Sequence, residues 1–302
     1  MKQRLKSKHR TSLLNIIVLL QLLRVKQWVK NMFVIVPVFF SGSFATQNII
    51  EVIISFTAFS LLTSAIYILN DWCDIESDKQ HAKKKSRPLA SGAVSTNAAL
   101  FLFITLLTTL AVICVYSNLS LMSVAFLAVY FILNTAYSFG LKHVPILELF
   151  IVGSGFIIRL LFGASVFGVI LSSWIIVCTG LLSLMLVVGK RRGDLAQKND
   201  VTMRRRSLIG YNLAFLDQLN TFLATATFTS YVVFCTTPFA TDRFGEAVLI
   251  TSGFVLFGIC TYMKLILFDE NGDDPTTMIL ADKSLNFTIF GWLITFIILI
   301  YH

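Results

Sequence analysis

Charged residues are scarce in this chain. Asp, Glu, Lys and Arg make up 14% of its 302 residues, against about 25% in ordinary soluble domains, while hydrophobic residues reach 56%. Hydrophobic runs near or above about 18 residues recur along the whole length, which is the signal for membrane-spanning helices. A soluble fold would have to bury nearly every one of these helices on all sides. The composition therefore predicts an integral membrane protein.

Cysteine chemistry is also missing. The five cysteines lie far apart, mostly within apolar runs, and none belongs to a CxxC pair or another metal-ligand spacing. We expect them to act as small hydrophobic side chains. The chain also lacks low-complexity segments and any linker long enough to separate two folding units. These absences predict that residues 1–302 form a single transmembrane domain.

The N-terminal stretch has a basic front and an apolar middle, like a cleavable signal peptide, but no small-residue cleavage site. Arg24 and Lys26 follow the apolar part directly. We therefore expect residues 1–27 to be a cytoplasmic or interfacial segment, with an amphipathic helix over residues 13–25.

Nine apolar stretches are long enough, or nearly so, to cross a bilayer. Because backbone polar groups that face lipid must be satisfied within their own segment, each stretch is expected to be a helix. The fold class is thus all-α and integral to the membrane. The predicted spans cover residues 28–43, 49–72, 97–117, 119–138, 146–168, 173–190, 215–237, 246–266 and 285–301.

Basic residues are distributed unevenly among the loops between these spans. With the N-terminus in the cytoplasm, the Lys79–Arg87 and Lys190–Arg206 clusters both fall inside, and the outside turns contain one base, Arg243. This topology places the C-terminus outside. The net charge of +9 then belongs to the cytoplasmic face, where bases bind anionic lipid at about 1 kcal/mol each or bind phosphorylated ligands. The chain has no basic, aromatic-rich domain that would indicate nucleic-acid binding.

Three aspartates end the second predicted span, within the stretch NDWCDIESDKQHAKKKSRPLASG. Asp71, Asp74 and Asp78 are spaced i, i+3 and i+7, so on a continuous helix they lie within about 60° of one another. Like charges at this spacing repel, and the negative end of the helix dipole adds to the repulsion. The arrangement therefore predicts a cation among the three carboxylates.

Two kinds of cation could fill this role. The acids could pair with Lys83, Lys84, Lys85 and Arg87 in a solvated loop, but such surface pairs contribute only about 0–1 kcal/mol. Mg²⁺ offers a better account, because it favours one or two carboxylates together with substrate phosphates. We favour a Mg²⁺–diphosphate site, with the neighbouring bases on phosphate oxygens.

The pattern NDxxDxxxD followed by HxxKxxRPLxxG resembles the first aspartate-rich motif of the UbiA-type membrane prenyltransferase superfamily. Its members have nine transmembrane helices around a central cavity, with cytoplasmic loops over a Mg²⁺–diphosphate site. The resemblance implies metal binding by Asn70, Asp71, Asp74 and Asp78, catalysis by the three aspartates, and substrate binding by Asn70, Lys84 and Arg87.

Ordinary members carry a second aspartate cluster after the sixth span, which this chain lacks. Here the loop reads VVGKRRGDLAQKND, with Lys190, Arg191 and Arg192 at its start. These bases predict an additional phosphate group on the substrate; the alternative is an ordinary positive-inside loop. Together with LRVKQWVKN, YSFGLKHVPILELF and ENGDDPTTMILADK, the GKRRGDL stretch resembles the decaprenyl-phosphate phosphoribosyltransferase branch of the family.

This branch implies transfer of 5-phosphoribose from 5-phosphoribosyl 1-diphosphate to a polyprenyl phosphate, with Mg²⁺ as cofactor and diphosphate as leaving group. The acceptor is already an anion at neutral pH, so no general base is needed, which agrees with a chain of only four histidines. Oligomer formation stays open. Further substrate-binding candidates are Lys26, Lys30, Tyr137, Lys142, Lys190, Arg191 and Arg192.

Arg159 falls about halfway through the fifth predicted span, where an isolated charge costs at least about 2.5–3.5 kcal/mol. Glu148 lies on the same side of that helix but is three turns away. Arg159 therefore either borders a polar cavity and binds substrate, or pairs with backbone carbonyls or Tyr137.

Two other functions use the same features. A prenyl diphosphate:aromatic acceptor prenyltransferase would use the same aspartates, but it is expected to carry the second acidic cluster. A non-catalytic transporter or lipid-binding membrane protein would be indicated by inverted repeats with broken helices, and we detect no such repeat.

Overall fold

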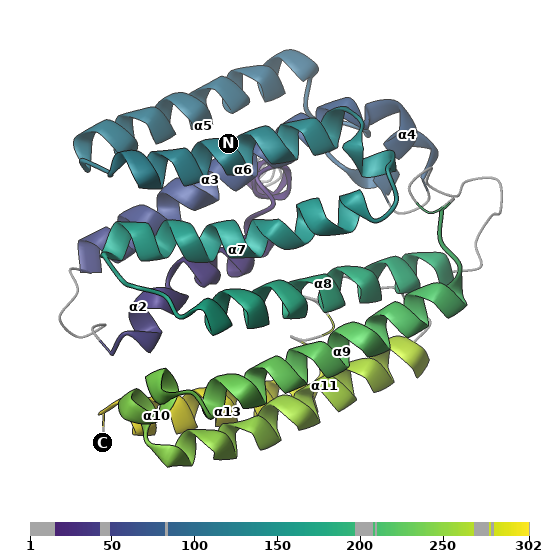
Figure 1. The fold of residues 1–302 in the computed structure, drawn as a ribbon. Coiled ribbons are helices and arrows are strands. Elements are labelled where there is room, and N and C mark those ends of the chain that lie inside the picture. Colours follow the sequence, from purple (N-terminus) through teal and green to yellow (C-terminus); the bar gives the residue numbers. More distant parts are fainter. Residues whose placement is uncertain are drawn as a thin grey trace, which may run out of the picture. The chain divides into compact units, whose positions relative to one another are not determined.

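The computed structural model describes residues 16–42, 49–81, 84–196, 208, 210–268, 278 and 281–301. Within these ranges every regular element is a helix (Figure 1). Lys83 and most of Glu270–Lys283 lie outside them. The main helices are α3 (Ile49–Cys73), α5 (Thr96–Tyr116), α6 (Leu121–Phe139), α7 (Leu147–Phe167), α8 (Ser173–Ala196), α9 (Leu213–Cys235), α11 (Thr251–Phe268) and α13 (Lys283–Tyr301). Shorter elements are η1 (Val25–Val34), α2 (Val36–Phe40), α4 (Ile75–Gln80), η2 (Lys84–Ser86), η3 (Leu141–His143), α10 (Pro238–Phe244) and η6 (Glu246–Ile250).

The described part of the chain has seven helices that are long and apolar enough to cross a membrane, or eight if α9 and α10, bent by 63°, are one span. The predicted count of nine is therefore not confirmed. Two predicted spans account for the difference. The first, residues 28–43, is divided at Ile35 into the 3-10 helix η1 and the five-residue helix α2, and residues 215–237 count as a span only when α9 is taken together with α10. The predicted N-terminal helix is present over residues 16–22 and ends before Arg24, whose backbone is left-handed with φ 50°.

The chain divides into two compact units. Unit 1 comprises Met1–Pro37, Thr46–Leu141 and Ile158–Gly168, and unit 2 comprises Val38–Ala45, Lys142–Ile157 and Val169–His302. That the whole chain forms a single domain stays a prediction.

In unit 1, α3 packs against α5, α6 and η1 (Figure 1). Serine N-caps precede α5 and α6. The Ser95 hydroxyl accepts a hydrogen bond from the Ala98 N–H, and the Ser120 hydroxyl accepts one from the Ser123 N–H. The core around α3 is formed mainly by Val34, Phe59, Leu62, Ile66, Leu127, Tyr130, Ile158 and Phe162. This packing fixes α3, and with it the aspartates at its C-terminal end.

In unit 2, α8 packs along α9, and α11 packs against α13 (Figure 1). Gly189 allows the close approach of α8 to α11, because a Cβ there would lie 2.4 Å from the Tyr262 hydroxyl. The largest core cluster includes Leu149, Met185, Val188, Leu216, Tyr262 and Leu285. This packing holds the GKRRGDL stretch on the last turns of α8.

Candidate metal and diphosphate site

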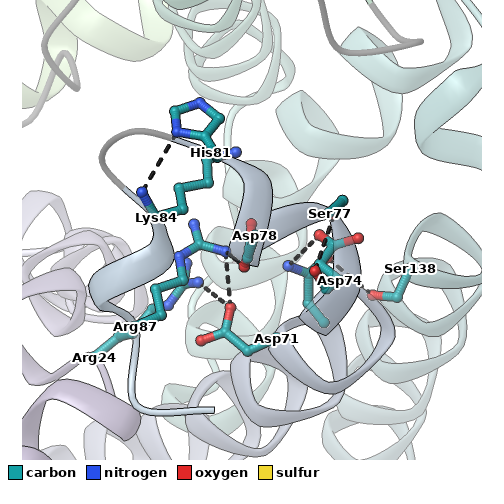
Figure 2. A network of polar contacts seen from close by, with 10 residues as sticks. Arg24, Asp71, Asp74, Ser77, Asp78, His81, Lys84, Arg87 and Ser138 are labelled. Carbon is teal, nitrogen blue, oxygen red and sulfur yellow. Dashed lines mark hydrogen bonds and ion pairs between the residues drawn. The ribbon is translucent and has the colours of Figure 1, made fainter. Parts of the chain in front are cut away.

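The aspartate-rich stretch is a broken helix. α3 ends at Cys73, α4 begins at Ile75, and Asp74 lies between them with φ −100° and ψ 4°. The i, i+3, i+7 geometry of one continuous helix is therefore interrupted at the middle aspartate. As Figure 2 shows, Asp71 and Asp78 point toward one side, and Asp74 points toward Ser138.

Asp71 and Asp78 converge on one guanidinium. Arg87 Nη1 donates to Asp78 Oδ2 at 2.6 Å and to Asp71 Oδ1 at 3.1 Å, and Arg24 pairs with Asp71 as well (Figure 2). The two aspartates are only 2% and 3% exposed. Charges this deeply buried require partners, and here two arginines balance two carboxylates.

Asp74 belongs to a neighbouring polar group. Its carboxylate accepts a hydrogen bond from Asn70 Nδ2 at 3.3 Å, and Asn70 Oδ1 lies 3.5 Å from the Ser138 hydroxyl of α6. The four residues of the predicted metal site are thus brought to one end of α3, in two groups. Ser138 was not predicted as a member of the site. It is 68 residues away from Asn70 along the sequence, and only the folded chain brings the two side chains together.

The loop after α4 carries the predicted phosphate ligands back to the aspartates. The backbone N–H of Lys84 donates to His81 Nδ1 at 3.4 Å, and the N–H of Arg87 donates to the Lys84 carbonyl at 2.9 Å. Leu89 anchors the loop, because it is buried in a cluster that includes Leu22 and Ala65. This anchoring holds the Arg87 side chain over Asp71 and Asp78.

Arg24 is a member of the site that the sequence did not identify. Its guanidinium pairs with Asp71 and lies over the Tyr67 ring, 4.6 Å from the centroid. Its left-handed backbone is uncommon for a residue other than glycine and is typical of functional sites. The predicted bases of the same segment differ in exposure: Lys26 is exposed and Lys30 is half-buried.

Asp71 and Asp78 fit the kind of Mg²⁺ site in which phosphates and waters complete the ligand set. Among the described residues, no group of three or more His, Cys, Asp or Glu side chains is placed to form a complete protein cage for a metal. Asp71 and Asp78 supply two convergent carboxylates, and Mg²⁺ characteristically takes one or two of these, with phosphates and waters as its other ligands.

Arg159 lies in a second polar cluster of unit 1. It is 4% exposed; its Nε donates to Asn31 Oδ1 at 2.9 Å and its Nη2 donates to the Tyr130 hydroxyl at 2.8 Å. Asn31 Nδ2 in turn donates to Ser60 and Thr63 of α3, at 3.0 and 3.2 Å. Asn31 and Tyr130 are therefore among the partners of Arg159. This network gives the KQWVKN stretch a role in joining η1 to α3 and α7, and substrate binding by Arg159 stays a prediction.

In unit 2, both predicted arginines of the GKRRGDL stretch have acidic partners. Arg191 forms a bidentate ion pair with Glu148, at 2.7 and 2.6 Å, and also contacts Asp194 at 3.2 Å. Arg192 Nε donates to Asp217 at 3.0 Å. Glu148 is fully buried, and its carboxylate balances the charge of the buried Arg191.

Next to this pair, the chain enters α7 through Ile146, which has φ 66°. The Tyr211 hydroxyl accepts a hydrogen bond from the Ile146 N–H at 2.6 Å. Burial raises the pKa of Tyr211, so its phenol stays protonated at neutral pH. The predicted candidate Lys142 lies just before this turn, in η3, and Tyr137 lies near the end of α6 in unit 1.

Comparison with known proteins identifies the family. The model of the UbiA prenyltransferase family matches residues 32–300. The chain belongs to this family. Two similar relatives are decaprenyl-phosphate phosphoribosyltransferases: that of Corynebacterium glutamicum is 29% identical, with 94% of this chain and 86% of the relative covered. That of Mycobacterium tuberculosis is 31% identical, with 90% and 91% covered.

The fold of this UbiA family member agrees with solved structures. A UbiA homolog from Archaeoglobus fulgidus bound to DMAPP and Mg²⁺ superimposes with a TM-score of 0.69, at 13% identity, over 93% of this chain and 98% of that chain. The predictions of an all-α integral membrane protein and of a transferase of this family are therefore confirmed. The A. fulgidus protein binds a divalent metal together with a prenyl diphosphate.

Proposed function

We propose that this protein transfers 5-phosphoribose from 5-phosphoribosyl 1-diphosphate to a polyprenyl phosphate in a Mg²⁺-dependent reaction. The choice of donor and acceptor rests on one observation. Over nine-tenths of both chains, this protein is similar to a relative named decaprenyl-phosphate phosphoribosyltransferase. The site agrees with a diphosphate leaving group, because Asp71 and Asp78 converge at one point with two arginines beside them.

The reaction needs one bond to form and one to break. An oxygen of the acceptor phosphate attacks C1 of the ribose, and the bond from C1 to the diphosphate oxygen breaks with its electron pair on the diphosphate. The acceptor oxygen is already ionised, so no side chain has to remove a proton. Accordingly, the chain's task is to position two anionic substrates and to balance the charge that develops on the leaving group.

In this proposal the acidic residues bind the metal and the basic residues bind phosphate groups. Asp71 and Asp78, with Asp74 and Asn70 beside them, hold Mg²⁺, which neutralises charge on the leaving diphosphate when it is bound. Arg87, on its anchored loop, binds diphosphate oxygens, and Lys84 is available from the same loop. Lys26, Lys30, Tyr137, Lys142, Arg159 and Lys190–Arg192 are the remaining candidates for the donor 5-phosphate and the acceptor phosphate.

The decisive experiment supplies the purified protein with labelled 5-phosphoribosyl 1-diphosphate and polyprenyl phosphate. Labelled lipid should form with Mg²⁺ and should disappear when EDTA removes the metal. Asp71→Asn and Asp78→Asn should lower its rate of formation by at least about 100-fold, because each removes a carboxylate from the metal. Glu76→Gln is the matched control, since Glu76 is an exposed acid of α4 that pairs with Lys79.

No labelled lipid under any condition would overturn the proposal. A parallel reaction with a prenyl diphosphate and 4-hydroxybenzoate tests the prenyltransferase alternative. Product in that reaction alone would assign the same aspartates to prenyl transfer.

A further inference from the structure

The point where the two buried carboxylates converge is held by arginine. Arg87 Nη1 contacts both Asp71 and Asp78, and Arg24 contacts Asp71 from a different segment (Figure 2). A metal ion bound by the same two carboxylate oxygens would compete with this guanidinium nitrogen for them. Two carboxylates and two guanidiniums together carry no net charge, so these four side chains balance one another.

From this geometry we propose that Arg24 and Arg87 are exchangeable counterions, which keep free metal out of the site and admit it only together with a diphosphate. The proposal rests on the metal–diphosphate site of the proposed function and adds how that site is loaded. Two positive charges leave the carboxylates and two arrive with the metal. The released guanidiniums then bind the diphosphate, because the planar guanidinium fork presents two N–H donors to neighbouring phosphate oxygens.

Burial makes the exchange cooperative. With Asp71 and Asp78 almost fully buried, a metal that displaced the arginines without an anion would leave two cations next to a divalent ion in a poorly solvated site. A diphosphate removes this excess charge in the same step. Metal alone should therefore bind weakly, and metal and diphosphate should each strengthen the binding of the other.

The two arginines are placed to move. Arg24 follows the helical segment 16–22 in a left-handed conformation, and its side chain is about one-fifth exposed. Arg87 lies on a loop and has a similar exposure of 23%. Both side chains can therefore rotate toward a ligand on the solvent side while Leu89 keeps the loop backbone in place.

The test measures Mn²⁺ retained by the metal-stripped, full-length protein in detergent, after separation from free ions by filtration, with and without methylenediphosphonate. The variants are Arg24→Gln, Arg87→Gln and the charge-retaining Arg87→Lys. Lys79→Gln is the matched control, because it removes one positive charge beside Asp78 from an exposed pair with Glu76. A cooperative thermal unfolding transition shows that a variant is folded. If Arg87→Gln does not fold, Arg24→Gln alone tests the proposal.

For the wild-type protein, diphosphonate should strengthen Mn²⁺ binding by about tenfold or more. Each Arg→Gln variant should bind Mn²⁺ alone about tenfold more tightly than wild type, since a competing charge is gone, and the effect of diphosphonate should shrink. Lys79→Gln should resemble wild type in both measurements. Arg87→Lys should bind Mn²⁺ alone as wild type does, because the competing charge is kept, but should lose part of the diphosphonate effect, because an ammonium group cannot form the bidentate contact. A purely structural role for the arginines gives the opposite sign, because disordered carboxylates bind metal less well.

Arg→Gln variants that bind Mn²⁺ no more tightly than wild type would overturn the exchange while leaving the proposed function intact. Absence of Mn²⁺ from every variant, with and without diphosphonate, would overturn the metal site itself. The first result concerns the counterion exchange alone, whereas the second also removes the metal from the proposed function, so the two failures are distinguishable.

Discussion

At the scale of single residues, the decisive property is the burial of charge. Asp71, Asp78 and Arg159 are each less than 5% exposed, and each is held by specific partners instead of by water. In a membrane protein, burying a charged side chain costs free energy, and such residues serve in binding sites or link helices. The aspartates meet arginines at the end of α3, whereas Arg159 meets the neutral side chains of Asn31 and Tyr130.

A substitution of Asn31 tests whether the Arg159 network links the helices. Asn31→Leu keeps the approximate volume but removes the acceptor for Arg159 Nε and the two bonds to Ser60 and Thr63. We expect a loss of about 2–3 kcal/mol in the free energy of unfolding, since a buried cation loses a partner. Thermal unfolding in detergent measures it. Asn134→Ala, which removes a bond within α6 to the Tyr130 carbonyl, should change far less; equal effects would contradict the linking role.

At the scale of elements, the helices are joined by close backbone contact and by ion pairs. Gly163 of α7 lies so close to η1 that a Cβ would be 1.9 Å from the Val34 carbonyl oxygen. In unit 2, α7 and α8 are joined by the buried pair between Glu148 and Arg191. Both contacts involve α7, the helix whose two ends belong to different units.

Gly163→Ala should destabilise the protein by about 3 kcal/mol or more, because backbone atoms have to move to admit one methyl group. Gly253→Ala is its control: Gly253 lies within α11 with no atom within 4 Å of the added Cβ. There, alanine should be neutral or should stabilise the helix by up to about 1 kcal/mol. The melting temperatures of the two variants decide the question, and a Gly163→Ala protein as stable as wild type would refute the close contact.

Glu148→Gln should lower the free energy of unfolding by about 3–5 kcal/mol, since it leaves Arg191 buried without its bidentate partner. Asp217→Asn, which breaks the more exposed pair with Arg192, should change it by only about 0–1 kcal/mol. Denaturation of the two variants compares them directly. If Glu148→Gln is fully stable but loses substrate affinity, Arg191 binds substrate instead of supporting the α7–α8 contact.

At the scale of the whole molecule, the chain is a membrane transferase whose loops carry most of its positive charge. Its net charge is +9, and the base-rich loops alternate with turns that contain almost no bases. The uneven distribution predicts a cytoplasmic N-terminus and an external C-terminus. Substrates with phosphate groups would then meet the site from the cytoplasmic side.

Reporter fusions test this topology. A reporter that is active only outside the cytoplasm should be active when fused after residue 302 and inactive when fused after Lys142 or Ala196. The reverse pattern would contradict the topology. A reporter that is inactive at all three positions would place the C-terminus in the cytoplasm and would indicate an even number of spans, such as the eight counted when α9 and α10 form one.

The sequence by itself determined the membrane class, the helical spans except for the first, the family, and the position of the aspartate-rich stretch. These depend on hydropathy, spacing and motif, which are properties of neighbours along the chain. Only the tertiary structure decided which charges meet: Arg24 reaches Asp71 from 47 residues away, Asn31 reaches Arg159 from 128, and Glu148 satisfies Arg191. A buried charge takes whichever partner the packing of distant helices brings to it, and no local pattern encodes that choice.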